Sequence, residues 1–329
     1  MLISLCLPLL GSAALALAAP AAARRLPPRT AAWSLTCAAV VAAGAWVTVL
    51  TMLALTLIGQ IPLIAAEAEW SPSALARATP VDRPVAAACA GAVLACAITL
   101  TAVSWRNIRV LLDAWRECRS LPAAGDLAVV DDPVPTAFAL PGAPGRVVVS
   151  SGMLQALDAD ERRALLAHER AHLRHRHHLF LLTLQLAAAV NPLLRPLTRT
   201  GTFVMERWAD ESAATAVGSR KLVAQAVARA ALAAKRAPRT TALAAVGGPV
   251  PQRVQALLTP PAPLRRGVVT ALAALMAVCC IALAHAGRDI DHIFDTASPE
   301  HGCRVTAPQQ EHRSHSPHPC HRESAQRLS

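Results

Sequence analysis

Two histidines and a glutamate in one short segment could hold and use a metal ion. The segment His168-Glu169-Arg170-Ala171-His172 fits the pattern H-E-x-x-H. On a helix, residues four apart lie one above the other, so both imidazoles can reach one Zn²⁺ at about 2.0–2.1 Å. Glu169 lies beside them, where its carboxylate can take a proton from a metal-activated water and pass it to a leaving amine. The segment therefore predicts one catalytic Zn²⁺ per chain, with Glu169 as the general base.

A catalytic zinc needs a third protein ligand and an open position for water. We expect Glu206, 34 positions after His172, to be that ligand. Asp210 lies one turn further along the same helical face, where it can accept a hydrogen bond from a ligand imidazole. Glu211 points about 100° away from Asp210 around the helix and is the weaker candidate for the third ligand. The alternative without a metal is an exposed helical face on which these carboxylates pair with Arg207.

The elements that must position these residues can be predicted from the sequence. Asp158 and Glu161 form a capping box at the start of a helix that runs through His172. Two more helices and an irregular linker should follow, over residues 202–217, 219–235 and 236–263. Ahead of the first helix, short β-prone segments separated by proline and glycine predict a small antiparallel sheet over residues 127–130, 136–140 and 146–150.

The rest of the chain is apolar enough for a membrane protein, because 54% of its 329 residues are hydrophobic and 16% are charged. About 20 apolar residues carry a helix across the hydrocarbon core. Runs of that length predict transmembrane helices over residues 2–23, 34–58, 85–105 and 267–287. A cleaved signal peptide is the alternative for the first run, since Ala16-Leu17-Ala18 resembles a cleavage site. Against it, two arginines follow this run and none precedes it.

A further apolar stretch, residues 179–194, must not cross the membrane. A crossing would leave His172 and Glu206 on opposite sides, where they could not share a metal, and 16 residues are too few to span comfortably. We expect this stretch in the core of the domain or dipping into the inner leaflet. Residues 106–122 carry apolar side chains at helical spacing and predict a helix along the membrane surface.

Arginines set the expected orientation, because Lys and Arg near the ends of spans stay on the cytoplasmic side. They follow the first and third runs, which places a peptidase-like domain of residues 106–266 in the cytoplasm and residues 288–329 outside. The expected fold class is a multi-pass α-helical membrane protein with four transmembrane helices and an inserted α+β domain. The net charge is +11, and the arginines that carry it gather at these membrane edges. They do not form a stripe interleaved with aromatic residues, which argues against nucleic acid as a partner and favours anionic lipids.

The outer segment, residues 288–329, is polar and rich in histidine. We expect it to be disordered, because its many Pro, Ser and Arg residues cannot form a core. Soft-metal or redox sensing is the alternative, since a disulfide between Cys303 and Cys320 is chemically possible there. The histidines concerned are His292, His301, His312, His315, His318 and His321.

Taken together, four segments resemble the M56 peptidases, typified by the β-lactam sensor-transducers BlaR and MecR. That family is related to the M48 family of HtpX-like and CAAX-processing proteases. The matching segments are AFALPG at 137–142, GRVVVSSGML at 145–154, ERRALLAHERAH at 161–172 and ERWAD at 206–210.

The resemblance implies a gluzincin-type metallopeptidase, with His168, His172 and Glu206 on zinc and Glu169 as the base. It also implies a supporting position behind the ligands for His177. The strand around residues 147–150 would be the edge to which an extended substrate adds as a further strand. In the sensor-transducers, the implied substrate is a winged-helix repressor of the BlaI or MecI type, and the protease itself is often cleaved.

Three functions follow as expectations. The first is a membrane zinc endopeptidase that cleaves a cytoplasmic repressor, the second an HtpX-like quality-control protease, and the third a non-catalytic receptor with a structural zinc. The chain departs from the sensor-transducers after its last apolar run, where about 42 residues stand in place of a penicillin-binding domain. It contains no S-x-x-K motif, so β-lactam sensing is not expected.

Overall fold

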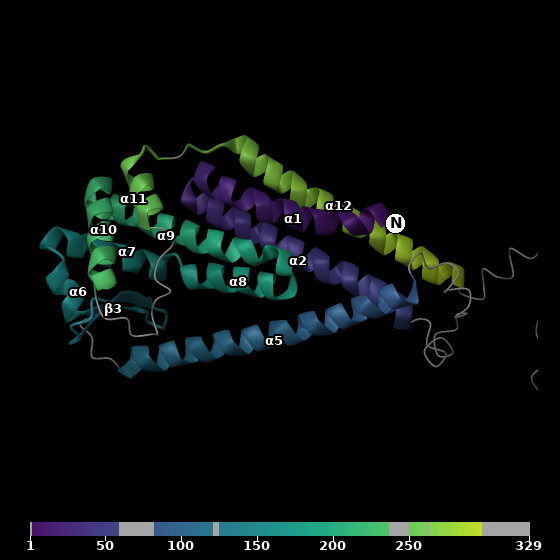
Figure 1. Ribbon diagram of the computed structural model, residues 1–329, viewed down its shortest axis with the longest axis horizontal. Helices are drawn as coiled ribbons and strands as arrows, with labels where there is room; N and C mark the ends of the chain where they lie inside the picture. Colours follow the sequence, from purple (N-terminus) through teal and green to yellow (C-terminus); the bar gives the residue numbers. More distant parts are fainter. Residues whose placement is uncertain (1, 59–81, 121–124, 237–249, 262, 298–329) are drawn as a thin grey trace, which may run out of the picture.

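The computed structural model describes residues 2–58, 82–120, 125–236, 250–261 and 263–297, and most of them are helical. Four long helices run together on one side of the molecule, and a smaller domain with a three-stranded sheet lies at their ends (Figure 1). The outer segment lies outside the described residues from position 298 onward, and Cys303, Cys320 and most of its histidines lie there.

Three of the described helices are long and apolar enough to cross a membrane, which marks the chain as a membrane protein. They contain the stretches Pro28–Leu57, Arg83–Ser120 and Arg266–Arg288. The first helix is not among these three, so a fourth span over residues 2–23 stays a prediction. The long helices are α1 (Leu2–Arg25), α2 (Pro28–Ile58), α5 (Arg83–Ser120) and α12 (Arg266–Ala297).

Two of the long helices extend beyond their apolar parts. α5 continues without a break to Ser120, which confirms the helix expected over residues 106–122 as far as Ser120; no Gly or Pro separates it from the apolar part. That it lies along the membrane surface stays a prediction. α12 continues to Ala297, into the segment expected to be a disordered tail. The first proline after its apolar part is Pro299, and helices commonly end just before a proline.

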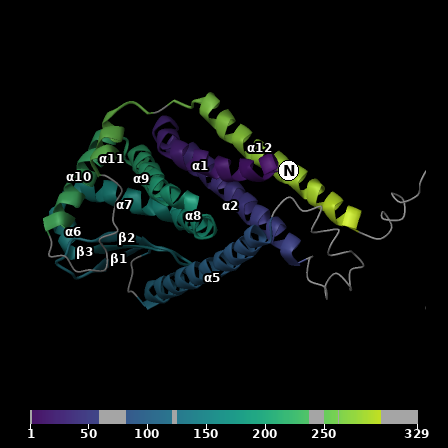
Figure 2. The same ribbon diagram turned by 45° about the vertical axis from the view of Figure 1, so that its right-hand side comes forward.

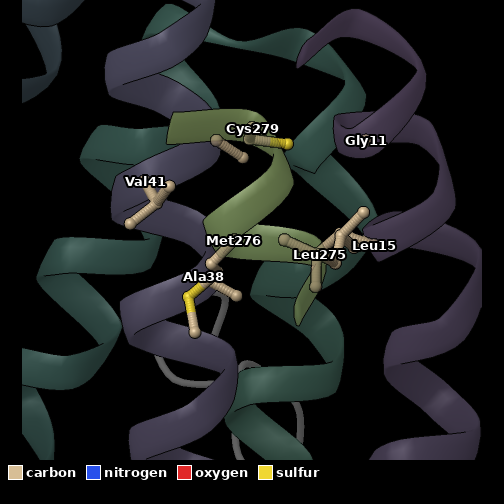
Figure 3. A pocket seen from close by; sticks show the side chains of 8 residues that line it. Gly11, Leu15, Ala38, Val41, Leu275, Met276 and Cys279 are labelled. Atoms are coloured by element: carbon tan, nitrogen blue, oxygen red, sulfur yellow. The ribbon is translucent and has the colours of Figure 1, made fainter. Parts of the chain in front are cut away.

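Small side chains line the contacts within the bundle of α1, α2 and α12. Ala19, Ala31 and Ala39 are completely buried in its apolar core. A Cβ on Gly11 would lie 2.7 Å from Cys279 Sγ, so the helices touch closely there, as small residues in membrane helices allow. A pocket between these helices is lined by aliphatic side chains, Met276 and the thiol of Cys279 (Figure 3). None of its lining residues carries a charge.

A helical hairpin packs against α1, α2 and α5 and returns to the smaller domain (Figure 2). At its tip, the completely buried side-chain amide of Asn191 donates a hydrogen bond to Ser12 Oγ at 2.9 Å. Cys96 Sγ of α5 lies 3.1 Å from the Val190 carbonyl oxygen. Residues 179–194 therefore turn back between the long helices, which agrees with the expectation that this stretch does not run straight across the membrane. The hairpin consists of α8 (His177–Val190), the short helix η1 (Pro192–Leu194) and α9 (Arg195–Val217).

The sheet has the strand order β1-β3-β2, which differs from the expected antiparallel sheet. β2 pairs with β3 antiparallel, but β1 pairs with β3 parallel. The expectation that residues 147–150 form an edge strand was also wrong, because β3 is the central strand. Val147 and Val149 are completely buried, and such a continuous apolar run is typical of a covered central strand. The strands are β1 (Leu127–Val130), β2 (Ala137–Leu140) and β3 (Arg146–Ser150).

Four shorter helices complete the smaller domain: α6 (Ser151–Ala156), α7 (Ala159–Arg174), α10 (Arg220–Arg236) and α11 (Val250–Leu258). α11 lies inside the segment 236–263, so the linker expected there was wrong for its central part. The prolines of this segment suggested a loop, but Pro251 lies in the first helical turn, where proline is tolerated. Val254 and Leu257 then pack against α10. α9 also begins at Arg195, before the residue 202 that was expected.

Candidate metal centre

α7 presents His168, Glu169 and His172 toward α9 and the sheet. The predicted capping box at its start is confirmed: the Asp158 carboxylate accepts from the Glu161 N–H at 2.9 Å, and Glu161 Oε2 accepts from the Asp158 N–H at 3.1 Å. These two bonds satisfy free N–H groups of the first turn. They fix where the helix begins, and therefore which of its side chains face α9.

Ligand atoms of His168, His172 and Glu206 converge on one point. His168 Nε2 and His172 Nε2 are 3.2 Å apart. Glu206 Oε2 lies 3.5 Å from His168 Nε2, and Glu206 Oε1 lies 3.6 Å from His172 Nε2. Ligand atoms around a tetrahedral zinc, each about 2.0–2.1 Å from it, are about 3.3–3.4 Å apart. The three side chains therefore fit a zinc ion, and the structure brings together the residues that the sequence selected.

The other ring nitrogen of each histidine meets a buried side chain. His168 Nδ1 lies 2.9 Å from Asp210 Oδ1, and His172 Nδ1 lies 2.9 Å from His177 Nδ1. Asp210 and His177 are each only 1% exposed. Contacts of this kind hold a metal-binding imidazole in one tautomer and one orientation. Both residues thus lie behind the candidate ligands, at the supporting positions expected from the sequence.

Arg253 belongs to the same cluster, and the sequence reasoning missed it. Its Nε and Nη2 donate to the two carboxylate oxygens of Asp210 at 2.8 and 2.7 Å, and its Nη1 lies 2.7 Å from Glu206 Oε2. Arg253 is only 6% exposed. A signal was present in the sequence: Val250, Arg253 and Leu257 fall on one face of α11. A lone charge on an otherwise apolar face indicates a buried partner.

A family model described as Peptidase family M48 matches residues 109–329, which is more than half of the chain. The chain belongs to peptidase family M48. No match to curated proteins or to solved structures was found. Membership of M48 makes the chain a metallopeptidase and agrees with the broader part of the resemblance described above. The narrower relationship to M56 stays a prediction.

The environment of Glu169 in this M48 chain suits proton transfer. Glu169 is only 9% exposed, and the backbone N–H of Ala139 on β2 donates a hydrogen bond to its carboxylate. Burial raises the pKa of Glu169, although the positive charges of His168 and Arg253 oppose this. A raised pKa makes the Glu169 carboxylate a stronger base toward a proton of water.

The remaining charges of the cluster are strongly coupled. Burial opposes a charge on His168, but the hydrogen bonds and charges of Asp210 and Glu206 outweigh it and raise the pKa of His168 to about 10. Burial, with the nearby charge of His168, lowers the pKa of His172 to about 4. Burial disfavours the Glu206 carboxylate, yet His168 and Arg253 hold its pKa well below the usual range. The site thus stabilises positive charge beside two carboxylates, where a divalent cation can replace the proton of His168.

Three neighbouring residues lie apart from the cluster. Glu211, the weaker ligand candidate, pairs with Arg220 at 2.6 Å. His175 stacks on Trp208, with 4.6 Å between ring centroids, and does not reach the ligand atoms. Arg207 does not pair with Glu206, as the metal-free alternative would have it, but donates to the carbonyl of Ala23 at the end of α1. Because the Asp210 side chain is also only 2% exposed, the two carboxylates do not form an exposed helical face.

Proposed function

We propose that this chain is a membrane-embedded, zinc-dependent endopeptidase. His168, His172 and Glu206 are the proposed zinc ligands, and Glu169 is the proposed general base. The observation that supports this most is the near-tetrahedral spacing of the three ligand atoms. Two imidazoles and one carboxylate are the ligands of many catalytic zinc sites, which leave one position open for water.

The surrounding residues suggest how each group acts. When bound, zinc supplies a Lewis acid that acidifies water and polarises a carbonyl oxygen. Glu169 accepts the proton of the attacking water and gives it to the leaving amine. Asp210 and His177 keep the two imidazoles in place. Arg253 neutralises the carboxylates that it contacts, because buried carboxylates without a positive partner would raise one another's pKa and bind protons.

β2 is the strand edge that supports binding of an extended substrate. The Ser150 N–H donates to the Thr136 carbonyl across the β2–β3 ladder, so by alternation Ala137 and Ala139 direct their backbone groups away from β3. The Ala139 N–H meets Glu169. A peptide that adds to this edge brings a peptide bond beside the general base. β2 therefore replaces the strand around residues 147–150 as the proposed substrate-binding edge.

We place the peptidase domain on the cytoplasmic side and retain α1 as a fourth span, following the distribution of arginines. The contacts of α1 support its retention, since cleavage after Ala18 would remove the buried Leu15 from the core and would take Ser12 away from its hydrogen bond with Asn191. Cation–π pairs on α5, between Arg109 and the Trp105 ring at 5.0 Å and between Arg119 and the Trp115 ring at 4.7 Å, suit an interface with anionic lipids.

Membrane proteins are the substrates that the observations favour. An HtpX-like role in membrane-protein quality control fits M48 membership and the insertion of the α8–α9 hairpin among the long helices. Cleavage of a BlaI- or MecI-type repressor, and of the protease itself, rests on the M56 resemblance alone. A non-catalytic metal receptor is a weaker alternative, because a structural zinc is usually closed by four protein ligands.

The test uses the purified full-length chain with unfolded casein as the probe substrate. Wild type should contain about one zinc per chain and cleave casein, and Glu169→Gln should keep the zinc but lose at least about 10³-fold in cleavage rate. Absence of cleavage by the zinc-loaded wild type, or equal cleavage by Glu169→Gln, would refute the proposal. Co-production with a winged-helix repressor, or with a misfolded membrane protein, then separates the two substrate classes.

A further inference from the structure

The tip of the α8–α9 hairpin lies level with the middle of the apolar part of α5. Cys96 Sγ is 3.1 Å from the Val190 carbonyl oxygen, and Thr99 Oγ1 is 2.8 Å from the Ala189 carbonyl oxygen. The apolar part of α5 extends from Val85 to Trp105, so Cys96 lies near its centre. When α5 crosses a membrane, the tip of the hairpin therefore lies near the middle of the hydrocarbon core.

α9 leads from this tip to the metal centre. Because an α-helix rises about 1.5 Å per residue, the segment from Arg195 to Glu206 covers about 16 Å. That is about half the thickness of a hydrocarbon core of about 30 Å. Glu206 therefore lies about level with the membrane surface next to the smaller domain, and the first part of α9 lies inside the membrane.

Two arginines of this membrane-embedded part share a face of α9 with Glu206. At about 100° per residue, Arg195, Arg199 and Glu206 fall within about 40° of one another around the helix. Both arginines are exposed, and in the described part of the chain neither forms an ion pair. The hydroxyls of Thr198 and Thr202 beside them donate to carbonyls of their own helix. The two guanidinium groups are thus the free polar groups of this face.

An arginine in contact with hydrocarbon is costly, and such residues usually mark a functional site. Side chains on a helix lean toward its N terminus, and the N terminus of α9 is the hairpin tip. Arg195 and Arg199 therefore lean toward the centre of the membrane, away from the nearer surface. Lipid phosphates lie at that surface, whereas a carboxylate on an inserted protein segment can reach the depth of these arginines.

We propose that the α9 face with Arg195 and Arg199 is the intramembrane part of the substrate-binding site, and that it pairs with acidic side chains of membrane-inserted substrate segments. This rests on the proposed function, because it assumes that the metal centre cleaves peptides. A segment held by its carboxylate on this face continues along α9 to Glu206 and the β2 edge. The arginines thus select substrates whose acidic residue lies within the membrane, one to three helical turns from the cleaved bond.

The experiment uses the full-length chain in lipid vesicles and two matched substrates. Each substrate is a single-span protein, with Glu in one and Gln in the other at the same depth in the half of the span nearest the cleaved bond. Wild type should cleave the Glu substrate about tenfold faster, the factor expected for one charge-assisted pair. The double variant Arg195→Gln, Arg199→Gln should bring this ratio to about one. Arg162→Gln, at an exposed position of α7, should leave the ratio unchanged.

Each result has a distinct meaning. The ratio of the two rates is internal to each variant, so it does not depend on how much of a variant is folded. Equal cleavage of both substrates by a wild type that cleaves casein would overturn this inference and leave the proposed function intact. Loss of casein cleavage in the wild type would overturn the proposed function instead. If the effect of the arginines followed the anionic lipid content of the vesicles and not the substrate Glu, they would bind lipid phosphate and the inference would be wrong.

Discussion

The two buried regions of this molecule are held together in opposite ways. In the bundle of α1, α2 and α12, most of the completely buried positions are small, such as Ala19, Ala31 and Ala39. In the metal centre, the buried side chains are ionisable, and each contact joins a particular donor to a particular acceptor. Packing between small side chains has no direction, whereas a charge-assisted hydrogen bond does. The position of the proposed zinc ligands therefore depends on the charge network more than on apolar packing.

Removing a charge from the metal centre should have the largest effect. Glu206→Gln removes the anionic ligand atoms and one of the two carboxylate partners of Arg253, so zinc affinity should fall at least about 100-fold, measured by competition with a metal-binding dye. Glu211→Gln is the matched control one position away, because Glu211 pairs with Arg220 instead. If both variants lost zinc to the same extent, zinc binding would not depend specifically on Glu206 and its charge network.

Arg253 tests whether the network needs geometry as well as charge. Arg253→Lys keeps the positive charge but cannot bond both Asp210 oxygens in parallel, so casein cleavage should fall about 10- to 100-fold. The zinc content should change less than in Glu206→Gln. Arg162→Gln serves as the control on an exposed position. Full activity of Arg253→Lys would show that charge alone is enough.

Adding a side chain should lower stability only where the new atom would collide with backbone. A Cβ on Gly152 of α6 would lie directly on the Pro133 carbonyl, whereas one on Gly44 of α2 would meet nothing within 4 Å. Gly152→Ala should therefore lower stability by about 1–3 kcal/mol in thermal unfolding of the purified chain. Gly44→Ala should be neutral or stabilising, because alanine is the better helix former. Equal effects at the two positions would contradict this difference.

The smallest expected change in stability concerns Asp158, the N-cap of α7, and this change should depend on pH. Hydrogen bonds from the backbone N–H groups of Glu161 and Asp160 hold the pKa of Asp158 below its usual range. A lowered pKa means that the cap stabilises the fold at neutral pH and loses this effect as the pH falls through the folded-state value. Asp158→Ala should thus lower the melting temperature slightly at pH 7, with no difference from wild type in strong acid. A difference that persisted in acid would mean that the carboxylate charge is not involved.

Local signals made α7 and its histidines predictable from the sequence, because the capping box and the spacing of His168 and His172 depend only on nearby residues. The choice of Glu206 over Glu211 followed from helical geometry and agrees with the directions in which these side chains point. Arg253 could not be placed in the same way, since its partner Asp210 is 43 positions away. The prolines around it also favoured a loop over a helix.

The sheet also depends on contacts between residues far apart in the sequence, which local patterns do not reveal. The three strands were found from their composition, but their order depends on which edge of β3 each neighbour covers, and this is decided by tertiary packing. The apolar runs predicted α2, α5 and α12 because hydrophobic length is a local property. The apolar spacing of residues 106–122 also predicted that the chain stays helical beyond the apolar part of α5. The continuation of α12 to Ala297 was not predicted.

The contact between Arg207 and the end of α1 also bears on the order in which the protein is made. Arg207 follows the candidate ligand Glu206 directly, and it is bonded to a carbonyl 184 positions earlier in the chain. α11, with Arg253, is synthesised after both. A growing chain therefore carries the two histidines well before it can complete the charge network around them. The complete charge network can therefore form only after α11 has left the ribosome.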